Sequence, residues 1–207
     1  MQYPQPTPIF HITHLENLEA ILHTGGLLPY AQKPPKRQSV AYEHIRARRA
    51  EVVVPVGPRG RLHEYVHFFF CPRPPMLYAI HTQSTNYQGG QRPILHLVSS
   101  VQRVAEARLP FVFTDRHAAV QHARFFHKLE HLKALDWDAI GASRWAEPRE
   151  KREKKQAEFL VKGLFPWELV EEIGVMDGEI QGLVQAILAR FPSLPHPPVR
   201  VRRGWYY

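Results

Sequence analysis

Residues 10–18 read FHITHLENL, a short apolar run that passes directly into a helical pattern. The run from Ile9 to Thr13 predicts a strand, and Thr13 and Glu16 have the spacing of a capping box at a helix start. Apolar residues then recur at helical spacing until the glycine pair at 25–26, which is expected to end the helix. The stretch therefore predicts a strand that enters a helix at once, with backbone hydrogen-bonding groups exposed at the edge of the strand.

Short strands and helices alternate along the rest of the chain, which predicts an α+β fold. Helices are expected from a cap at Ser39 to about Arg49, after Asp115 through Ala119, over 129–135 and over 178–191. Strands are expected over the β-branched or apolar runs 51–55, 66–71, 93–98, 111–113, 157–161, 170–175 and 199–207. The charged residues 143–155 lack apolar periodicity, so an exposed loop is expected there. Without a repeat or a linker, residues 1–207 are predicted to form a single domain of short-stranded central β-sheets with peripheral helices.

The charge balance favours an acidic partner. The chain has a formal net charge of +8 and a sequence pI of about 9.8, and most of its 27 basic residues are arginines. Arginine makes forked contacts to phosphates and base edges, so nucleic acid is the expected partner. A basic protein without such a partner is equally compatible with the charge alone.

Cysteine usage and hydropathy indicate a reducing compartment. Cys71 is the one cysteine in the sequence, so no internal disulfide can form, and we expect a small buried hydrophobe. No N-terminal stretch resembles a signal peptide, and no apolar run reaches the ~18 residues of a membrane span. The expected location is cytoplasmic, with no membrane partner.

Several common enzyme motifs are absent from the sequence. It contains no G-x-G-x-x-G, no Walker loop and no G-x-S-x-G elbow, which argues against Rossmann, P-loop and serine-hydrolase chemistry. His11 with His14, and His127 with His131, do not form the H-E-x-x-H order of a zinc-protease helix, and no cysteine pairs with them. No metal site is expected.

Four stretches spread over the chain carry a family resemblance. Besides residues 10–18 they are VHFFFCPRPPMLY at 66–78, VFTDRHAA at 112–119 and QAEFLV at 156–161. A basic helix ending at Arg49 and the closing Trp-Tyr-Tyr also agree. In this order the stretches resemble the DarT family of DNA ADP-ribosyltransferase toxins, and the resemblance covers essentially the whole chain from Ile9.

The resemblance implies a fold, a reaction and partners. The fold would be ADP-ribosyltransferase-like, and the enzyme a mono-ADP-ribosyltransferase, a pentosyl-transferring glycosyltransferase with NAD as co-substrate and no metal. The acceptor would be a thymidine base in single-stranded DNA. Such an enzyme is the toxin of a toxin–antitoxin pair, and the antitoxin, with its macrodomain, would be a separate chain.

Glu158 and Arg49 are the expected catalytic residues. Cleavage of the nicotinamide–ribose bond produces an oxocarbenium-like centre, which a carboxylate at Glu158 can stabilise while accepting a proton from thymine N3. The Arg49 guanidinium can hold the NAD pyrophosphate or a thymine oxygen that gains negative charge. Without the resemblance, Arg49 would be read as one solvated charge in a basic run.

Residues of the first strand and helix are expected to bind NAD, together with Arg49. The peptide groups of His11 and Ile12 would bind the carboxamide, and Thr13 and Asn17 would lie on the ribose or adenosine side. Packing against the adenosine is expected from Ala20 and Leu28. A simple helix cap is an equally good interpretation of Thr13, and core packing a better one for the last two.

The acceptor is expected to bind the basic stretch before Glu158 and the turn after Thr114. Gln156 can orient the amide-like edge of thymine, and His117 can contact the target base. The substrate-binding candidates on the charged stretch are Arg144, Trp145 and Arg149, with Lys151, Arg152, Lys154 and Lys155 as further cations. A loop glutamine and a surface histidine are the simpler alternatives for Gln156 and His117.

Two other functions stay open at this stage. The NAD chemistry could act on RNA or protein instead of DNA, since positive charge does not separate these acceptors. A non-catalytic nucleic-acid-binding domain on the same scaffold is the third reading, and the presence of both Glu158 and Arg49 argues against it.

Overall fold

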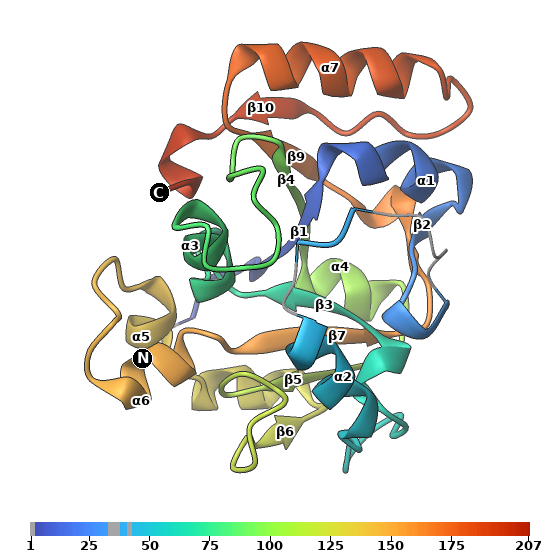
Figure 1. Cartoon of the computed structure of the whole chain (residues 1–207). Helices are drawn as coiled ribbons and strands as arrows, with labels where there is room; N and C mark the ends of the chain where they lie inside the picture. The colour runs from blue at the N-terminus through green and yellow to red at the C-terminus, as the bar shows by residue number, and fades with distance from the viewer. Residues whose placement is uncertain (1–2, 33–37, 41–42) are drawn as a thin grey trace.

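A computed structural model describes residues 3–32, 38–40 and 43–207 of the chain. Eight strands form one mixed sheet in the order β10-β9-β4-β1-β3-β7-β5-β6, and β2 pairs with β8 in a second, small sheet (Figure 1). The strands are β1 (Pro8–His14), β2 (Gly26–Leu27), β3 (Tyr65–Phe69), β4 (Ile94–Ser100), β5 (Phe111–Thr114), β6 (Phe125–Phe126), β7 (Glu158–Lys162), β8 (Phe165–Pro166), β9 (Glu172–Val175) and β10 (Val199–Val201). The predicted α+β fold is confirmed.

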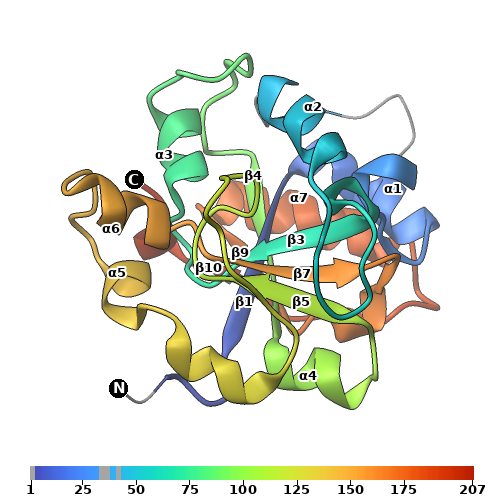
Figure 2. The same cartoon turned by 90° about the horizontal axis from the view of Figure 1, so that it is seen from below.

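Short helices surround the sheet. Figure 2 shows α2 and α4 on opposite sides of the central strands β3, β7 and β5. The α-helices are α1 (Leu18–His23), α2 (Glu43–Glu51), α3 (Pro75–His81), α4 (Val101–Glu106), α5 (Trp137–Gly141), α6 (Arg149–Lys154) and α7 (Gly178–Ala189). The 3-10 helices are η1 (Leu15–Asn17), η2 (Tyr30–Gln32), η3 (Leu62–Glu64), η4 (Leu129–Ala134), η5 (Trp167–Leu169) and η6 (Arg203–Trp205).

Alternation along the central strands gives the sheet two apolar faces. Phe68 of β3 lies opposite Phe159 of β7, and both belong to the largest buried cluster together with Phe113 of β5. Successive side chains of a strand point to opposite faces, so Phe69 and its partner Glu158 lie on the other side. The register of β3 and β7 therefore brings Glu158 to the face that α2 and η3 cover.

Four local predictions are wrong. The expected strand at 51–55 is not formed, because α2 continues through Glu51 and Val53 makes only an isolated bridge. The expected helix after Asp115 is replaced by turns over residues 115–124, whose two ends are joined by the Asp115 carboxylate. The expected loop at 143–155 contains α6, and the strand expected at 199–207 ends at Val201.

The caps of the first two helices also differ from the prediction. His14, not Thr13, caps η1, since its ring accepts a hydrogen bond from the Glu16 N–H at 3.2 Å. Helix α2 begins at Glu43, so Ser39 lies outside its capping position. The strands predicted at 66–71, 93–98, 111–113 and 157–161 are confirmed as β3, β4, β5 and β7. Burial of Cys71, at 5% exposure, is confirmed as well.

Candidate active site

A cavity of about 590 Å³ opens on the face of the sheet that carries Glu158. Alternate residues of β3 form part of its wall, and further residues come from helices α2, α3 and α6, the 3-10 helices η2 and η3, the turn at His117 and the start of β7. The lining residues are Tyr30, Ile45, Arg49, Leu62, His63, Tyr65, His67, Phe69, Pro75, Met76, Tyr78, Ala79, His117, Trp145, Ala146, Arg152, Gln156 and Glu158. Both predicted catalytic residues are among them.

Glu158 is a buried carboxylate with several hydrogen-bond donors. Its side chain is 1% exposed and accepts hydrogen bonds from Arg49 Nη1 at 3.0 and 2.8 Å and from the Ala118 N–H at 2.9 Å. Burial raises the pKa of this carboxyl, but Arg49, His117 and the Ala118 N–H outweigh burial, so the pKa lies below its ordinary value. Glu158 is therefore ionised at neutral pH.

Arg49 keeps one nitrogen available at this centre. Near the C-terminal end of α2, its side chain is 13% exposed, and Nη1 contacts both oxygens of Glu158. The second nitrogen, Nη2, is buried and has no hydrogen-bond partner among the described residues. A buried donor without a partner is costly, so this nitrogen suits an oxygen that a substrate brings into the cavity.

His117 lies beside the carboxylate as a neutral ring. Its Nε2 is 3.8 Å from Glu158 Oε1, and its Nδ1 accepts a hydrogen bond from the Ala119 N–H at 3.2 Å. Burial lowers the pKa of His117, and the positive charges of Arg49 and Arg48 lower it further, against the opposing effect of Glu158. Because Nδ1 is an acceptor, a neutral ring carries its proton on Nε2, which faces the carboxylate.

The residues predicted to bind NAD lie around β1 and α1. His11 Nδ1 is 2.8 Å from the His67 carbonyl oxygen, at the point where β1 and β3 pair through only Phe10 and Phe69. The Asn17 amide donates to Thr13 Oγ1 at 3.2 Å and exchanges hydrogen bonds with the Gln38 backbone at 2.9 and 3.0 Å. Asn17 thus fastens residue 38, beyond the segment that lies outside the described residues, to the start of α1.

Of these seven predicted residues, only Arg49 is among the described residues that line the cavity. Ile12 packs in a buried cluster with Phe69, which does line it, while Ala20 is exposed and Leu28 half-buried. The roles of His11, Ile12, Thr13, Asn17, Ala20 and Leu28 stay predictions.

Some of the predicted acceptor residues line the cavity, and others lie outside its lining. Trp145, Gln156 and Arg152 line the cavity, and Gln156 donates to the Arg152 carbonyl at 3.1 Å. Arg144 and Arg149 are exposed, and Arg149 pairs with Glu153 at 2.9 Å.

The prediction of a DNA contact for Lys155 is wrong. Its side chain is buried, at 3% exposure, and donates to the Ile140 carbonyl at 2.9 Å.

Some site features leave little signal in a sequence. The Ala118 N–H contacts Glu158, and the Thr114 hydroxyl accepts from the Glu158 N–H at 3.3 Å. A backbone donor carries no residue-type signature, so Ala118 could not be identified as part of the site. Tyr78, 43% exposed on the cavity wall, lies 5.5 Å from the Trp145 ring, and its place in the 66–78 stretch was the available signal.

The described residues show neither a membrane span nor a metal-binding cluster. Among the described residues, none of the helices has the length and apolar character needed to cross a membrane. Nor do three or more His, Cys, Asp or Glu side chains in the described ranges gather where they would hold a metal ion.

Known proteins resemble the chain over its full length. A "DNA ADP-ribosyl transferase" from Thermus aquaticus is 74% identical over 207 residues, which are 100% of this chain and 92% of that protein. The structure "Thermus sp. 2.9 DarT in complex with ADP-ribosylated ssDNA" matches with a TM-score of 0.98 and 58% identity, covering 100% of this chain and 99% of that one. "Thermus sp. 2.9 DarT in complex with NAD+" matches with a TM-score of 0.94 and 56% identity over 100% of both chains.

A more distant relative joins two activities in one chain. It is a "DNA ADP-ribosyl transferase-DNA ADP-ribosyl glycohydrolase fusion protein" from Thermosipho africanus, 26% identical over 204 residues, 94% of this chain and 50% of the fusion protein. The model of the family described as "ssDNA thymidine ADP-ribosyltransferase, DarT" matches residues 10–207. With the buried Glu158–Arg49 pair in its cavity, the chain belongs to the DarT family of single-stranded DNA thymidine ADP-ribosyltransferases.

Proposed function

We propose that this chain uses the cavity around Glu158 to transfer ADP-ribose from NAD to thymidine bases in single-stranded DNA. The observation that carries the proposal is the ionised, buried Glu158 carboxylate, which Arg49 Nη1 contacts. Arg49 Nη2 is buried and has no hydrogen-bond partner among the described residues. Such a pair offers negative charge to a developing cation and a free donor to an oxygen of the substrate.

The reaction exchanges one bond to the anomeric carbon of the NAD ribose for another. The bond from that carbon to the nicotinamide nitrogen breaks, and nicotinamide leaves with the electron pair. A bond from the same carbon to thymine N3 forms, and the N3 proton passes to Glu158. While the ribose carries positive charge, the Glu158 carboxylate stabilises it, and Arg49 Nη2 binds a pyrophosphate or thymine oxygen.

His117 acts as a hydrogen-bond donor in this proposal. Its Nδ1 is already an acceptor for the Ala119 N–H, which leaves Nε2–H as the group that faces the reacting centre. A thymine oxygen gains negative charge as N3 loses its proton, and a neutral donor beside it lowers that cost. Glu158 is then the general base that removes the N3 proton, and His117 stabilises the negative charge on the deprotonated thymine.

The two substrates approach from different elements. NAD is assigned to β1 and α1, with the His11 and Ile12 peptide groups, Thr13 and Asn17 at the nicotinamide riboside and Ala20 and Leu28 at the adenosine. The DNA strand is assigned to the part of the cavity wall that Trp145, Arg152 and Gln156 supply, with Gln156 at the target base. Trp145 and the cations Arg144, Arg149 and Arg152 are placed along the flanking nucleotides, where stacking and phosphate contacts give affinity.

The biological role follows from the chemistry. Modified thymidine blocks base pairing, and the enzyme is accordingly a toxin. A separate antitoxin chain with a macrodomain would remove the modification, and a relative that fuses the transferase to a DNA ADP-ribosyl glycohydrolase supports the pairing of the two activities. We place the protein in the cytoplasm, where its DNA substrate lies, as a single domain.

The intact mass of short oligonucleotides after incubation with protein and NAD tests the proposal. We expect one added ADP-ribose on single-stranded DNA that contains thymine and none on thymine-free DNA. In Glu158→Gln the transfer rate should fall by about 10²–10⁴-fold, the usual loss when a general base is removed. Modification of RNA or protein but not of DNA would favour an ADP-ribosyltransferase with one of those acceptors. An unchanged transfer rate in Glu158→Gln would contradict the role of Glu158 as the general base.

A further inference from the structure

Residues 115–124 form a loop between β5 and β6 that carries two groups of the active site. His117 and the Ala118 N–H both face Glu158 from this loop, at 3.8 and 2.9 Å. Near its beginning, Thr114 Oγ1 donates to the Arg116 carbonyl at 2.6 Å and accepts from the Glu158 N–H. Because turns, not a regular element, hold the loop, its position depends on side chains at its ends and outside it.

Asp115 joins the two ends of the 115–124 loop. Its carboxylate, 5% exposed, accepts from the Arg124 N–H at 3.0 Å and from Arg124 Nε at 2.9 Å. It also accepts from Arg116 Nε and Nη2 at 3.2 and 3.4 Å. A buried carboxylate persists only when such donors surround it, so the closed loop and the ionised Asp115 require each other.

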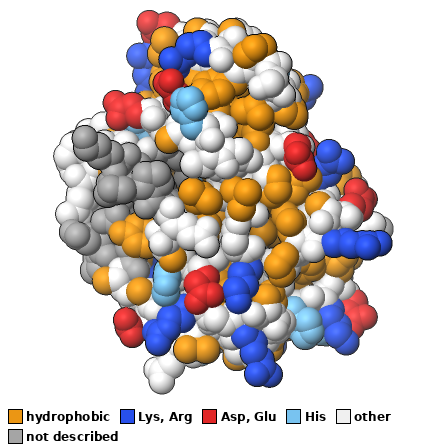
Figure 3. All heavy atoms as spheres, turned by 90° about the vertical axis from the view of Figure 1, so that its right-hand side faces the viewer, with side chains coloured by type: hydrophobic (Ala, Val, Ile, Leu, Met, Phe, Trp, Pro, Cys, Tyr) orange, Lys and Arg blue, Asp and Glu red, His pale blue; other side chains and the backbone are white. Residues whose placement is uncertain are grey.

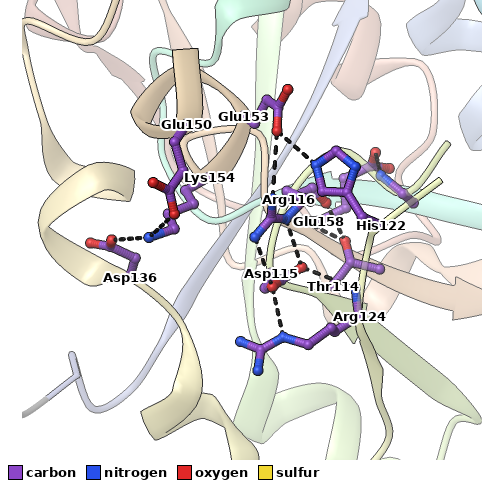
Figure 4. Close-up of polar contacts among 11 residues, drawn as sticks. Thr114, Asp115, Arg116, His122, Arg124, Asp136, Glu150, Glu153, Lys154 and Glu158 are labelled. Atoms are coloured by element: carbon purple, nitrogen blue, oxygen red, sulfur yellow. Dashed lines mark hydrogen bonds and ion pairs between the residues drawn. The ribbon is translucent and has the colours of Figure 1, made fainter. Parts of the chain in front are cut away.

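Glu153 of α6 ties the same loop to the helix that leads into β7. One carboxylate oxygen lies 2.9 Å from His122 Nε2 and accepts from Arg116 Nη1 at 3.5 Å, while the other accepts from Arg149 at 2.9 Å. Figure 4 shows Glu153 directed at Arg116 and His122, with Asp115 below them against Arg124. Since β7 begins at Glu158, Glu153 connects the segment before the catalytic base to the loop that faces it.

We infer that Asp115 and Glu153 are positioning residues that hold the 115–124 loop, and with it His117 and the Ala118 N–H, against Glu158 during transfer to thymine. The inference rests on the proposed function and deepens it. Neither carboxylate lines the cavity, so each acts through Arg116, Arg124 or His122. A displacement of about 1 Å at a reacting group can cost about 10²-fold in rate, so loosening this loop lowers the rate of transfer.

Glu153→Gln is the main test, and Glu150→Gln is its matched control. Both are glutamates of α6, three positions apart, and Glu150 pairs with Lys154 at 2.9 Å. Steady-state transfer to a thymine oligonucleotide is measured as kcat and as the KM for each substrate, with thermal unfolding of every variant. We expect kcat in Glu153→Gln to fall about tenfold or more, with an unchanged KM for NAD and a melting temperature close to that of Glu150→Gln.

DNA binding separates positioning from general damage. Removing the Glu153 charge leaves Arg116, His122 and Arg149 with one anion fewer, so oligonucleotide affinity should stay equal or increase while kcat falls. A double-mutant cycle with Arg116→Gln should be non-additive in kcat, since both changes break the same link. Asp115→Asn should lower kcat in the same way, and if it fails to fold, the Glu153 series still decides.

Two results would overturn the inference. One is a kcat in Glu153→Gln equal to that in Glu150→Gln, and the other is additivity of Glu153→Gln with Arg116→Gln. A wild-type protein that modifies no DNA would instead overturn the proposed function, so the two failures can be told apart.

Discussion

At the residue scale, the site depends on two titratable groups, one held ionised and the other held neutral. Glu158 is buried, yet Arg49 and the Ala118 N–H keep its pKa below the ordinary value. The pKa of His117 is also lowered, first by burial and then by two arginines, which favours the neutral ring. Together they give a charged base beside a neutral donor, which is the state that removal of a proton from thymine requires.

The pH dependence of transfer follows from these two shifts. Both pKa values are lowered, so acidification should leave the rate constant for transfer unchanged as the pH falls through 6.5, the ordinary value for histidine. The rate should fall only below that point, where His117 and Glu158 take up protons. In His117→Gln the acid limb should report the titration of Glu158 alone, below the ordinary pKa of a glutamate. A wild-type midpoint at or above pH 6.5, from single-turnover rates, would contradict the assignment.

At the element scale, α6 and the residues after it divide the basic stretch into structural and exposed cations. Lys154 pairs with Asp136 and Glu150, and Lys155 is buried against the Ile140 carbonyl. Burial lowers the pKa of Lys155, which also contacts Cys71. Arg144, before the helix, is exposed. Charge in the sequence therefore overstates the number of cations that a DNA strand can reach.

The two kinds of cation should respond differently to neutralisation. In Lys155→Met the apolar volume is kept but the Ile140 carbonyl loses its donor, so stability should fall by about 1–3 kcal/mol. The salt dependence of DNA binding by Lys155→Met should equal that of the wild-type protein. In Arg144→Gln the free energy of unfolding should be unchanged. The slope of log affinity against log salt concentration should become shallower by about 0.7, because one phosphate contact is lost. Chemical denaturation and a salt titration of oligonucleotide binding measure both, and a reduced slope in Lys155→Met would return that residue to the DNA path.

At the scale of the whole molecule, the net charge is +8, but the basic side chains do not all lie together. On the face seen in Figure 3, basic side chains lie among acidic ones around exposed apolar atoms. Several arginines of the described residues are engaged in ion pairs, such as Arg190 with Glu19 and Arg92 with Asp177, both at 2.7 Å. We therefore expect long-range attraction to DNA to be directed by the exposed cations near the cavity more than by the total charge.

The expectation of a single domain makes a thermal prediction. Residues of α2, β3, α3, α6 and β7 all meet at or beside the cavity, so the chain should unfold in one cooperative transition. NAD at about 100 times its dissociation constant should raise the free energy of unfolding by about 2.7 kcal/mol. Arg49→Gln should lose most of this stabilisation. Calorimetry with and without NAD measures it, and two separate transitions would contradict the single domain.

The sequence by itself determined the strands that build the centre of the sheet and the residue types that carry the chemistry. Alternating or continuous apolar runs around Phe68 and Phe159 encode burial locally, so β3 and β7 could be predicted from them. Glu158 and Arg49 could be named because the stretches around them resemble the DarT family; without that resemblance, Arg49 would be one solvated charge in a basic run. Their roles, and those of the predicted NAD and DNA contacts, remain predictions for the experiments described above.

Only the tertiary structure decided which of these groups meet. Glu158 and Arg49 lie 109 positions apart, and their contact depends on the register of β7 with β3 and on α2 crossing that face. A helix is predicted after Asp115 through Ala119, yet the Asp115 bonds to Arg124 close residues 115–124 into a loop. Lys155 is buried because the fold supplies a carbonyl for its ammonium group. Each of these outcomes depends on partners distant in the sequence, and local propensity contains no information about them.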